Sequence, residues 1–368
     1  MSYPKLNIDL KKLEENTRVE VRKLAEHGVT VMGVNKVFNG LPQTADAVVR
    51  GGIEVVAESR VNNLKKIQHV SCKKCLLRTP SPSEIEDVVR YADISLNSEV
   101  GVIRALSEEA VRQNRTHQVL LMVDMGDIRE GIWFEDSRYL ENAVRNTLEL
   151  PNINLYGLGT NFSCYGSVKP TRENGLLFIR LARRLEETFL IEFPFLSGGN
   201  CTSYHMIEKG IWPEGINHLR IGALHQFGIE YVDIRYLDDF HHSCMDVNRV
   251  VSDLYILEAE IIEVNTKPTV PFGEQSLDCF MQAKTFVDRG MRKRAVLALG
   301  HQDISARNCW PVDPGIELSG QTFDHTIIDI ENSDRDYSTG DIIAFEVDYT
   351  GLLSCCTSED VAIAFITS

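Results

Sequence analysis

The sequence has no long apolar run and no leader of the secretory type. None of its stretches reaches the roughly 18 apolar residues that a membrane-spanning helix needs. The N-terminal segment MSYPKLNIDLKKLEEN turns charged early and contains no apolar core of a signal peptide. Nine cysteines in a chain of 368 residues do not form a disulfide scaffold. We therefore expect a cytoplasmic protein that does not bind membranes.

Basic residues and metal-ligand spacings are also scarce. The chain carries 38 lysines and arginines against 53 aspartates and glutamates, which gives a formal net charge of −15. Such a charge disfavours a nucleic-acid partner, because phosphate backbones attract clustered basic side chains. Cys72 and Cys75 form a lone CxxC spacing without a second pair. The sequence therefore predicts no metal site.

Between residues 30 and 220 the sequence contains a regular alternation of short β-branched runs and amphipathic helical segments. Eight runs resemble strands, at residues 29–34, 54–57, 75–77, 94–96, 119–123, 155–159, 194–197 and 218–221. Because strands and helices alternate over this range, the pattern predicts an α/β protein with a parallel (β/α)8 barrel of the TIM type. A doubly wound sheet is the alternative that the same pattern allows.

Beyond residue 252 the helical segments give way to strand-like runs separated by turns rich in Pro, Gly, Asn and Asp. These runs are found at residues 254–264, 294–299, 325–330, 341–347 and 361–365. They predict a mainly β C-terminal domain. We place the barrel in residues 1–250 and the β domain in residues 251–368. Residues 1–10 include an extra strand-like piece that could join the C-terminal sheet.

The chemistry of a (β/α)8 barrel takes place at the C-terminal ends of its strands. Lys36 follows the first predicted strand, and Arg129 lies on a short glycine-bounded loop after the fifth. The seventh and eighth strands run into the segments LSGGNCTS and LRIGA. Loops in these two positions bind phosphate in barrels through backbone N–H groups and hydroxyls. A lysine at the barrel mouth together with two such loops is a more specific signal than any of them alone.

Longer segments carry a resemblance that spans both predicted domains. They read IDLKKLEEN, VNKVF, AESRVNNLKK, MVDMGDIREGI, NFSCYG, LSGGN, WPEGINHLRIG and RKRAVLALGHQD. The chain resembles the pyridoxal-phosphate (PLP) enzymes with the alanine racemase fold, known as fold type III, and most closely the ornithine racemases within them. This resemblance implies a PLP-binding barrel followed by a β domain, active as a head-to-tail homodimer on a free amino acid.

The resemblance also assigns roles to residues of the barrel. Lys36 matches the lysine that binds PLP as an imine and then acts as a base. Arg220 matches the arginine that faces the pyridine nitrogen, and Arg129 matches an arginine near the phenolic oxygen of PLP and the substrate carboxylate. Asn161 stands where alanine racemases have a histidine under the ring. The phosphate would be bound by the backbone of Gly222 and Ala223, with the hydroxyls of Thr202 and Ser203 as further candidates.

These roles fit racemisation. An imine with PLP acidifies the α-hydrogen of the substrate, because the ring accepts the charge left on the carbon. An arginine is always protonated, so Arg220 would donate to the pyridine nitrogen and keep a proton off it. The ring is then a weaker electron sink, which favours reprotonation at the same carbon over transamination. We predict an isomerase that interconverts L and D amino acids through an external aldimine and α-proton exchange.

The sequence departs from alanine racemases where a second acid/base is needed. Phe272 lies near the position of their catalytic tyrosine, and phenylalanine cannot transfer a proton. The candidates for the opposite-face acid/base are four residues of the β domain, namely Cys279, His301, Asp303 and Tyr349. A one-base mechanism, in which Lys36 serves both faces, is the alternative.

We expect a basic amino acid as the substrate, ornithine first and lysine second, since the resemblance is to ornithine racemases. Arg129 would anchor the α-carboxylate, and Glu230 or Asp303 could pair with the ω-ammonium. A buried carboxylate of this kind rejects analogues that lack the ammonium. Two other interpretations stay open, a PLP lyase or aldolase of the same fold and a PLP carrier protein without turnover.

Overall fold

The computed structural model describes residues 2–242 and 249–367. The chain divides into two compact units. The first, here called the barrel unit, comprises Lys12–Phe240; the second, the β unit, comprises Met1–Lys11 and His241–Ser368. The division falls after Phe240 rather than after residue 250. No helix in the described ranges has the length and apolar composition needed to cross a membrane.

The barrel unit contains a closed sheet of eight parallel strands. They are β2 (Thr30–Val34), β3 (Val55–Glu58), β4 (Lys73–Leu76), β5 (Ile94–Asn97), β6 (His117–Asp124), β8 (Ile153–Gly159), β9 (Phe195–Ser197) and β10 (His218–Ile221). The strands pair in the order β5-β4-β3-β2-β10-β9-β8-β6, and the pairing of β5 with β6 closes the sheet. The predicted fold class is confirmed, and the doubly wound alternative is wrong because the sheet closes on itself.

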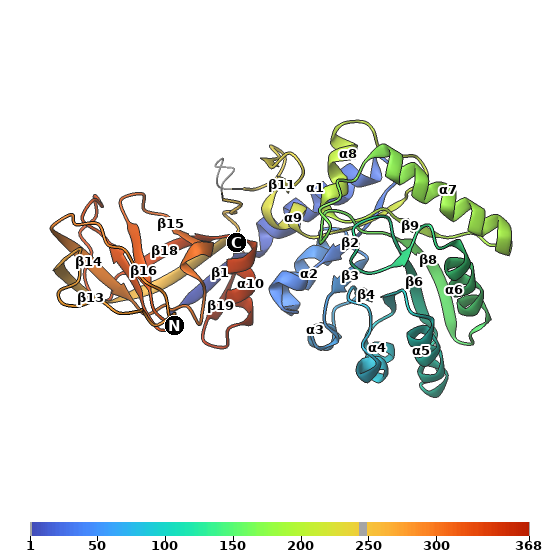
Figure 1. The fold of residues 1–368 in the computed structure, drawn as a ribbon, viewed down its shortest axis with the longest axis horizontal. Helices are drawn as coiled ribbons and strands as arrows, with labels where there is room; N and C mark the ends of the chain where they lie inside the picture. The colour runs from blue at the N-terminus through green and yellow to red at the C-terminus, as the bar shows by residue number, and fades with distance from the viewer. Residues whose placement is uncertain (1, 243–248, 368) are drawn as a thin grey trace. The chain divides into compact units, whose positions relative to one another are not determined.

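Helices connect the strands and surround the barrel (Figure 1). They are α2 (Pro42–Arg50), α3 (Val61–Lys66), α4 (Ile85–Tyr91), α5 (Val100–Arg112), α6 (Ser137–Glu149), α7 (Arg172–Phe189), α8 (Tyr204–Glu208) and α9 (Ala223–Phe227), and α1 (Leu10–Ala25) precedes the first barrel strand. The start of α7 shows how the sequence specifies such an element. Thr171 and Asn174 form a capping box there, in which each side chain accepts the backbone N–H of the other residue.

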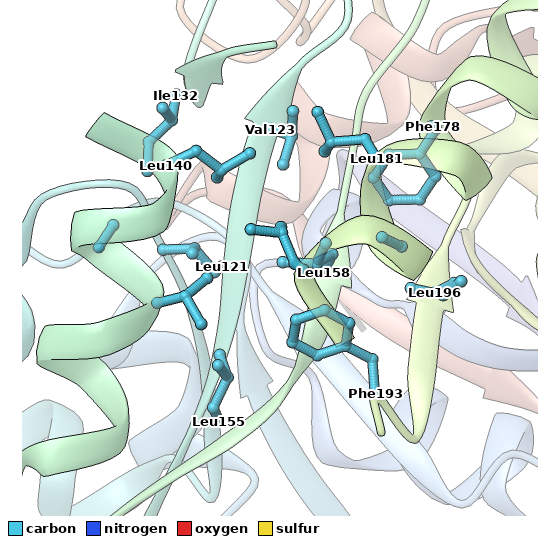
Figure 2. Close-up of a cluster of buried hydrophobic side chains, with 14 of the residues drawn as sticks. Leu121, Val123, Ile132, Leu140, Leu155, Leu158, Phe178, Leu181, Phe193 and Leu196 are labelled. Carbon is cyan, nitrogen blue, oxygen red and sulfur yellow. The ribbon is translucent and has the colours of Figure 1, made fainter. Parts of the chain in front are cut away.

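Apolar clusters stabilise the barrel, and two of them lie on either side of its strands. In the outer cluster, Leu121 of β6 and Leu158 of β8 pack with Leu140 of α6 and Phe178 of α7 (Figure 2). Because side chains alternate along a strand, the residues between them point inward. The inner cluster consists of Met32, Val34, Ala57, Cys75, Ile94, Leu96, Leu120 and Met122. The packed interior gives the strand ends at the mouth a rigid base.

The β unit contains an eight-stranded, mostly antiparallel sheet. Its strands are β1 (Lys5–Asp9), β13 (Tyr255–Pro268), β14 (Met291–Leu297), β15 (Cys309–Pro311), β16 (Glu317–Gln321), β17 (Thr326–Asp329), β18 (Ile342–Val347) and β19 (Ala362–Ile366), and one helix, α10 (Tyr349–Thr357), precedes β19. β1 pairs antiparallel with β13 and parallel with β19. The N-terminal strand is therefore part of the C-terminal sheet.

Candidate active site

Lys36 lies directly beyond the end of β2. The strand ends at Val34, and Lys36 opens a short 3-10 turn. The Lys36 side chain is exposed, and no carboxylate of the described residues forms an ion pair with it. The preceding residue, Asn35, is buried, and its N–H donates to the carbonyl oxygen of Ala57 (2.9 Å). The fold thus presents an accessible amine directly after a buried and hydrogen-bonded residue.

A buried carboxyl, which was not predicted from the sequence, lies beside Asn35. Glu58, the last residue of β3, is 0% exposed. Its two oxygens accept hydrogen bonds from Asn35 Nδ2 and Asn63 Nδ2, each at 3.1 Å, and Thr44 Oγ1 lies 3.1 Å from Asn35 Oδ1. Burial raises the pKa of Glu58 to about 7, although the two amide donors oppose this shift. Glu58 could have been found from the sequence as a charged residue at the end of a predicted strand, where barrels carry their functional groups.

Arg220 of β10 is a cation buried inside the barrel, with 4% of its surface exposed. Its Nη1 donates to Ser197 Oγ (2.5 Å), and its Nη2 donates to Thr160 O (2.7 Å) and Asn161 Oδ1 (3.3 Å). All three partners are neutral, and burial lowers the pKa of Arg220 to about 10. A guanidinium carries five N–H donors, so part of its donor capacity is left for a further neutral acceptor.

His218 shares the Ser197 hydroxyl with Arg220. His218 Nδ1 lies 2.8 Å from Ser197 Oγ, and that oxygen already accepts a hydrogen bond from Arg220. The hydroxyl hydrogen is therefore directed to His218 Nδ1, which acts as an acceptor. Burial lowers the pKa of His218 to about 3. The neutral ring thus helps to orient Arg220 without adding a charge.

Arg129 lies on the loop after β6 and is surrounded by polar groups from two loops. It forms an ion pair with Glu130 and a close contact with Cys164 Sγ from the loop after β8. The amide of Asn161 contacts Glu130 Oε1 in one orientation (3.4 Å) and Arg129 Nη1 in the other (3.2 Å). Asn161 also contacts Arg220. The structure therefore brings three predicted site residues together and adds two that were missed, Glu130 and Cys164.

The loop after β10 lies against the end of β2. A Cβ on Gly222 would lie 2.7 Å from the carbonyl oxygen of Val34, so only glycine permits this approach. The Gly222 N–H points to Cys201 Sγ (3.4 Å), and the N–H of Ala223 also contacts this thiol. Sulfur is a weak acceptor. These two predicted phosphate-binding N–H groups therefore lack a strong partner among the residues that the structure describes.

The two predicted hydroxyls lie in the 3-10 turn after β9. Thr202 Oγ1 donates to Asn200 Oδ1 (2.8 Å), and Ser203 Oγ donates to the carbonyl oxygen of Gly198 (2.8 Å). Ser203 is buried, whereas Thr202 is partly exposed. Both hydroxyls are used within their own loop, and Thr202 is the more accessible of the two.

Glu230 and Asp303, the two candidates for the substrate ammonium, both have local partners. Glu230 is buried in the β-hairpin β11–β12 (Ile229–Glu230 and Arg235–Tyr236), where its oxygens accept the N–H groups of Val232 (2.7 Å) and Asp233 (2.9 Å). Asp303 is buried in the β unit and accepts the N–H of Gly300 (3.0 Å). Each carboxylate thus stabilises a turn, which uses part of its acceptor capacity.

The other candidates for a second acid/base are also in the β unit. His301 is exposed, and its ring packs edge-on against Phe280, with centroids 4.9 Å apart. The exposed Cys279 directly precedes Phe280, so Cys279 and His301 belong to one surface region. Tyr349 is the first residue of α10. Among the described residues, no group of three His, Cys, Asp or Glu side chains is arranged to bind a metal ion.

The barrel residues fit the three functional ends of PLP. The amine of Lys36 suits its aldehyde. Arg220 uses some of its N–H donors on neutral partners, and the donors that remain suit the pyridine nitrogen. The N–H groups of Gly222 and Ala223, directed at a weak acceptor, suit the phosphate.

Comparisons with known proteins identify the family. The family model for the alanine racemase N-terminal domain matches residues 8–226. An ornithine racemase of Acetoanaerobium sticklandii is 38% identical over 361 residues, which cover 97% of this chain and 98% of that protein. A lysine racemase of Thermotoga maritima is 36% identical over 360 residues, 97% of both chains.

A solved structure supports the fold independently. The alanine racemase of Bartonella henselae, determined with covalently bound pyridoxal phosphate, aligns over 100% of both chains with a TM-score of 0.70 and 14% sequence identity. The resemblance inferred from the sequence segments is confirmed by the family match and by the two racemases. The chain therefore belongs to the alanine racemase family of pyridoxal-phosphate-dependent amino-acid racemases.

Proposed function

We propose that this protein racemises a free basic amino acid, ornithine first and lysine second, at the mouth of its barrel. The two similar racemases are named for these substrates, and each aligns with nearly the whole chain. The observation that carries the reaction type is Arg220, a buried guanidinium with neutral partners only. We also expect the enzyme to work in the cytoplasm as a homodimer.

Bound PLP withdraws electrons from the substrate α-carbon and thereby makes the α-hydrogen acidic. Lys36 binds the cofactor covalently, releases it to the substrate amine and then acts as a base on one face. Arg220 would donate a hydrogen bond to the pyridine nitrogen and keep it unprotonated, because a guanidinium is positively charged and can only donate. The phosphate would be bound by the backbone of Gly222 and Ala223, with the hydroxyls of Thr202 and Ser203 as further candidates, and Asn161 would lie under the ring.

A racemase must move a proton on both faces of the α-carbon. We assign the opposite face to Cys279, His301, Asp303 or Tyr349, supplied from the β unit of the second subunit in a head-to-tail homodimer. Cys279 and His301 support this assignment best, since both are exposed. A one-base mechanism with Lys36 alone is the rival.

For the substrate, Arg129 is the anchor of the α-carboxylate. A second carboxylate pairs with the ω-ammonium, and the assigned candidates are Glu230 and Asp303. Their bonds to backbone N–H groups leave lone pairs free, because each carboxylate oxygen accepts more than one hydrogen bond. A charge-assisted hydrogen bond contributes about 1.5–3 kcal/mol.

The test is chiral analysis of the products after the purified, PLP-loaded protein is incubated with each L-amino acid. D-ornithine should accumulate fastest and D-lysine next, and D-alanine should form slowly. Glu230→Gln or Asp303→Asn should weaken ornithine turnover at least tenfold more than alanine turnover. A wild-type preference for alanine or serine would contradict the substrate assignment. The absence of any D-product would contradict the proposed function.

A further inference from the structure

The carboxyl of Glu58 is bonded to both sides of the loop that contains Lys36. On one side it accepts the amide of Asn35, the residue before the lysine (3.1 Å). On the other side it accepts the amide of Asn63 (3.1 Å), against which Gly40 of this loop packs, and the Gly40 N–H is near enough to lower the pKa of Glu58. Gly40 has a φ of +73°, and a Cβ there would lie 2.8 Å from the Asn63 backbone, so the loop lies close against α3. A single buried group thus fixes the lysine loop at two points.

The hydrogen bonds around Asn35 can be completed in two ways. Thr44 Oγ1 lies 3.1 Å from Asn35 Oδ1 and 2.9 Å from the carbonyl oxygen of Leu41, and a hydroxyl has one hydrogen to donate. When Glu58 is ionised, Thr44 donates to Asn35, and Asn35 donates to Glu58. When Glu58 is protonated, a turned Asn35 amide accepts from Glu58 and donates to Thr44, whose hydrogen goes to Leu41. The loop anchor can therefore remain bonded in both charge states.

The surroundings of Glu58 supply amides and only one cation. Burial raises the pKa of Glu58 to about 7, and the amides of Asn63 and Asn35, the charge of Lys66 and the N–H of Gly40 oppose this shift. No side chain of the described residues forms an ion pair with Glu58. Three neutral neighbours, Asn35, Gly40 and Asn63, indicate a group that fixes a conformation rather than one that neutralises a charge.

We propose that Glu58 is a positioning residue for Lys36, which acts through Asn35 and Gly40 on the backbone before and after the lysine. This inference rests on the proposed role of Lys36 as the cofactor-binding lysine. Lys36 has to present its amine first to the cofactor and later to the substrate α-carbon. An anchored loop restricts the amine to the short path between these points, and this lowers the entropic cost of each proton transfer.

The test compares Glu58→Gln with Glu54→Gln, the same chemical change at an exposed position before the other end of β3. Glutamine cannot ionise and always presents a donor, so it is restricted to the arrangement with the turned Asn35 amide and cannot adopt the one that the ionised carboxylate supports. We expect kcat to fall on the order of tenfold with little change in KM, because the substrate anchors are elsewhere. The midpoint of the pH-dependent absorbance of the bound cofactor should shift in Glu58→Gln and stay unchanged in Glu54→Gln.

A second variant covers the case in which Glu58→Gln does not fold. Thr44→Val preserves the side-chain shape and removes the hydroxyl that orients Asn35, so it should shift the same absorbance midpoint by a smaller amount. Wild-type kcat and an unshifted midpoint in the folded variants overturn the proposal, as does a loss of thermal stability alone. Borohydride reduction with peptide mapping separates the two failures. An unlabelled Lys36 in the wild-type protein contradicts the proposed function itself, whereas a labelled Lys36 with unaffected variants contradicts only the role of Glu58.

Discussion

Arg220 illustrates how one side chain can select a reaction among those that PLP supports. Its three hydrogen-bonded partners are a hydroxyl, a carbonyl and an amide, all neutral. Since none of these hydrogen-bonded partners carries a negative charge, the guanidinium makes a proton on an adjacent pyridine nitrogen costly. A weaker electron sink shortens the lifetime of charge on the α-carbon and so favours racemisation over transamination.

For Arg220→Glu we predict a change in the absorbance spectrum of the bound cofactor as well as in the rate of racemisation. A glutamate would stabilise a protonated pyridine nitrogen and produce a new long-wavelength absorbance band with substrate, while racemisation slows at least tenfold. Absorbance spectra and chiral assays of the PLP-loaded variant measure both effects. Arg18→Glu, the same charge reversal on the exposed face of α1, is the control. Wild-type spectra and turnover in Arg220→Glu would mean that this residue does not contact the ring.

The residues at the mouth were predictable to different degrees. Lys36 and Arg220 follow from their places at strand ends combined with the sequence resemblance. Glu58 was missed because its importance comes from side chains of other segments, Asn35 and Asn63, which a strand pattern does not bring together. The contact between Arg129 and Cys164 joins two loops in the same way. Such contacts depend on tertiary structure, which local patterns do not encode.

At the scale of elements, the pairing of β5 and β6 that closes the barrel buries a histidine. His117 Nε2 lies 2.7 Å from Ser95 Oγ, which also accepts the amide of Asn97 (2.8 Å). The serine hydrogen is therefore directed to the ring nitrogen, which must be unprotonated to accept it. Burial lowers the pKa of His117 to about 4.

This burial predicts a loss of stability in mild acid. In the unfolded chain a histidine takes up a proton below about pH 6.5, whereas His117 in the fold stays neutral until about pH 4. The unfolded state therefore gains protons between these values, and the free energy of unfolding should fall by up to about 3 kcal/mol. Urea unfolding at several pH values between these limits measures the fall.

A matched pair of variants isolates the contribution of His117. His117→Gln can retain the bond to Ser95 but cannot be protonated, so its stability should depend less on pH than that of the wild type. His27→Gln, at an exposed position, should behave as the wild type does. An equal loss of stability in all three proteins would assign the acid sensitivity to other groups.

Elements of the barrel were easier to predict than those of the β unit. Strands and amphipathic helices alternate in the barrel, and each period appears in the sequence. The helix α10 was missed because its segment YTGLLSCCT has no charged face, and Leu352 and Cys355 within it are buried. Its start is specified by Asp348, whose Oδ1 accepts the Gly351 N–H (2.7 Å). β15 has only three residues, and β16 contains Gly320 and a register shift beside it, so neither produces a regular alternation.

At the scale of the whole molecule, the division of catalytic groups between subunits can be tested directly. Single changes Cys279→Ala, His301→Ala, Asp303→Asn and Tyr349→Phe should include at least one that lowers kcat by about 10²–10⁴-fold, the usual contribution of a general acid or base. We expect that variant, when co-expressed with Lys36→Ala, to regain part of the wild-type activity. A mixed dimer of this kind contains one site in which both groups are intact, and chiral assays of the purified mixture measure it.

Two controls define the outcome. Each variant expressed alone should remain impaired at the same protein concentration, and size-exclusion chromatography should show that all of them form dimers. A mixture as inactive as its components would place both groups in one subunit. Normal turnover in all four variants would exclude the whole set and favour the one-base mechanism.

The pairing of β1 with β13 and β19 has a consequence for the order in which the chain acquires its structure during translation. Lys5 lies opposite Glu258 in one neighbouring strand and Ala362 in the other. β1 therefore waits for two partners that are synthesised much later, whereas Lys12–Phe240 can close its own sheet before them. We expect stalled nascent chains that end near residue 300 to protect the barrel from protease but leave β1 open to cleavage. Until β19 is synthesised, β1 carries an unpaired edge, which chaperones and other chains can bind.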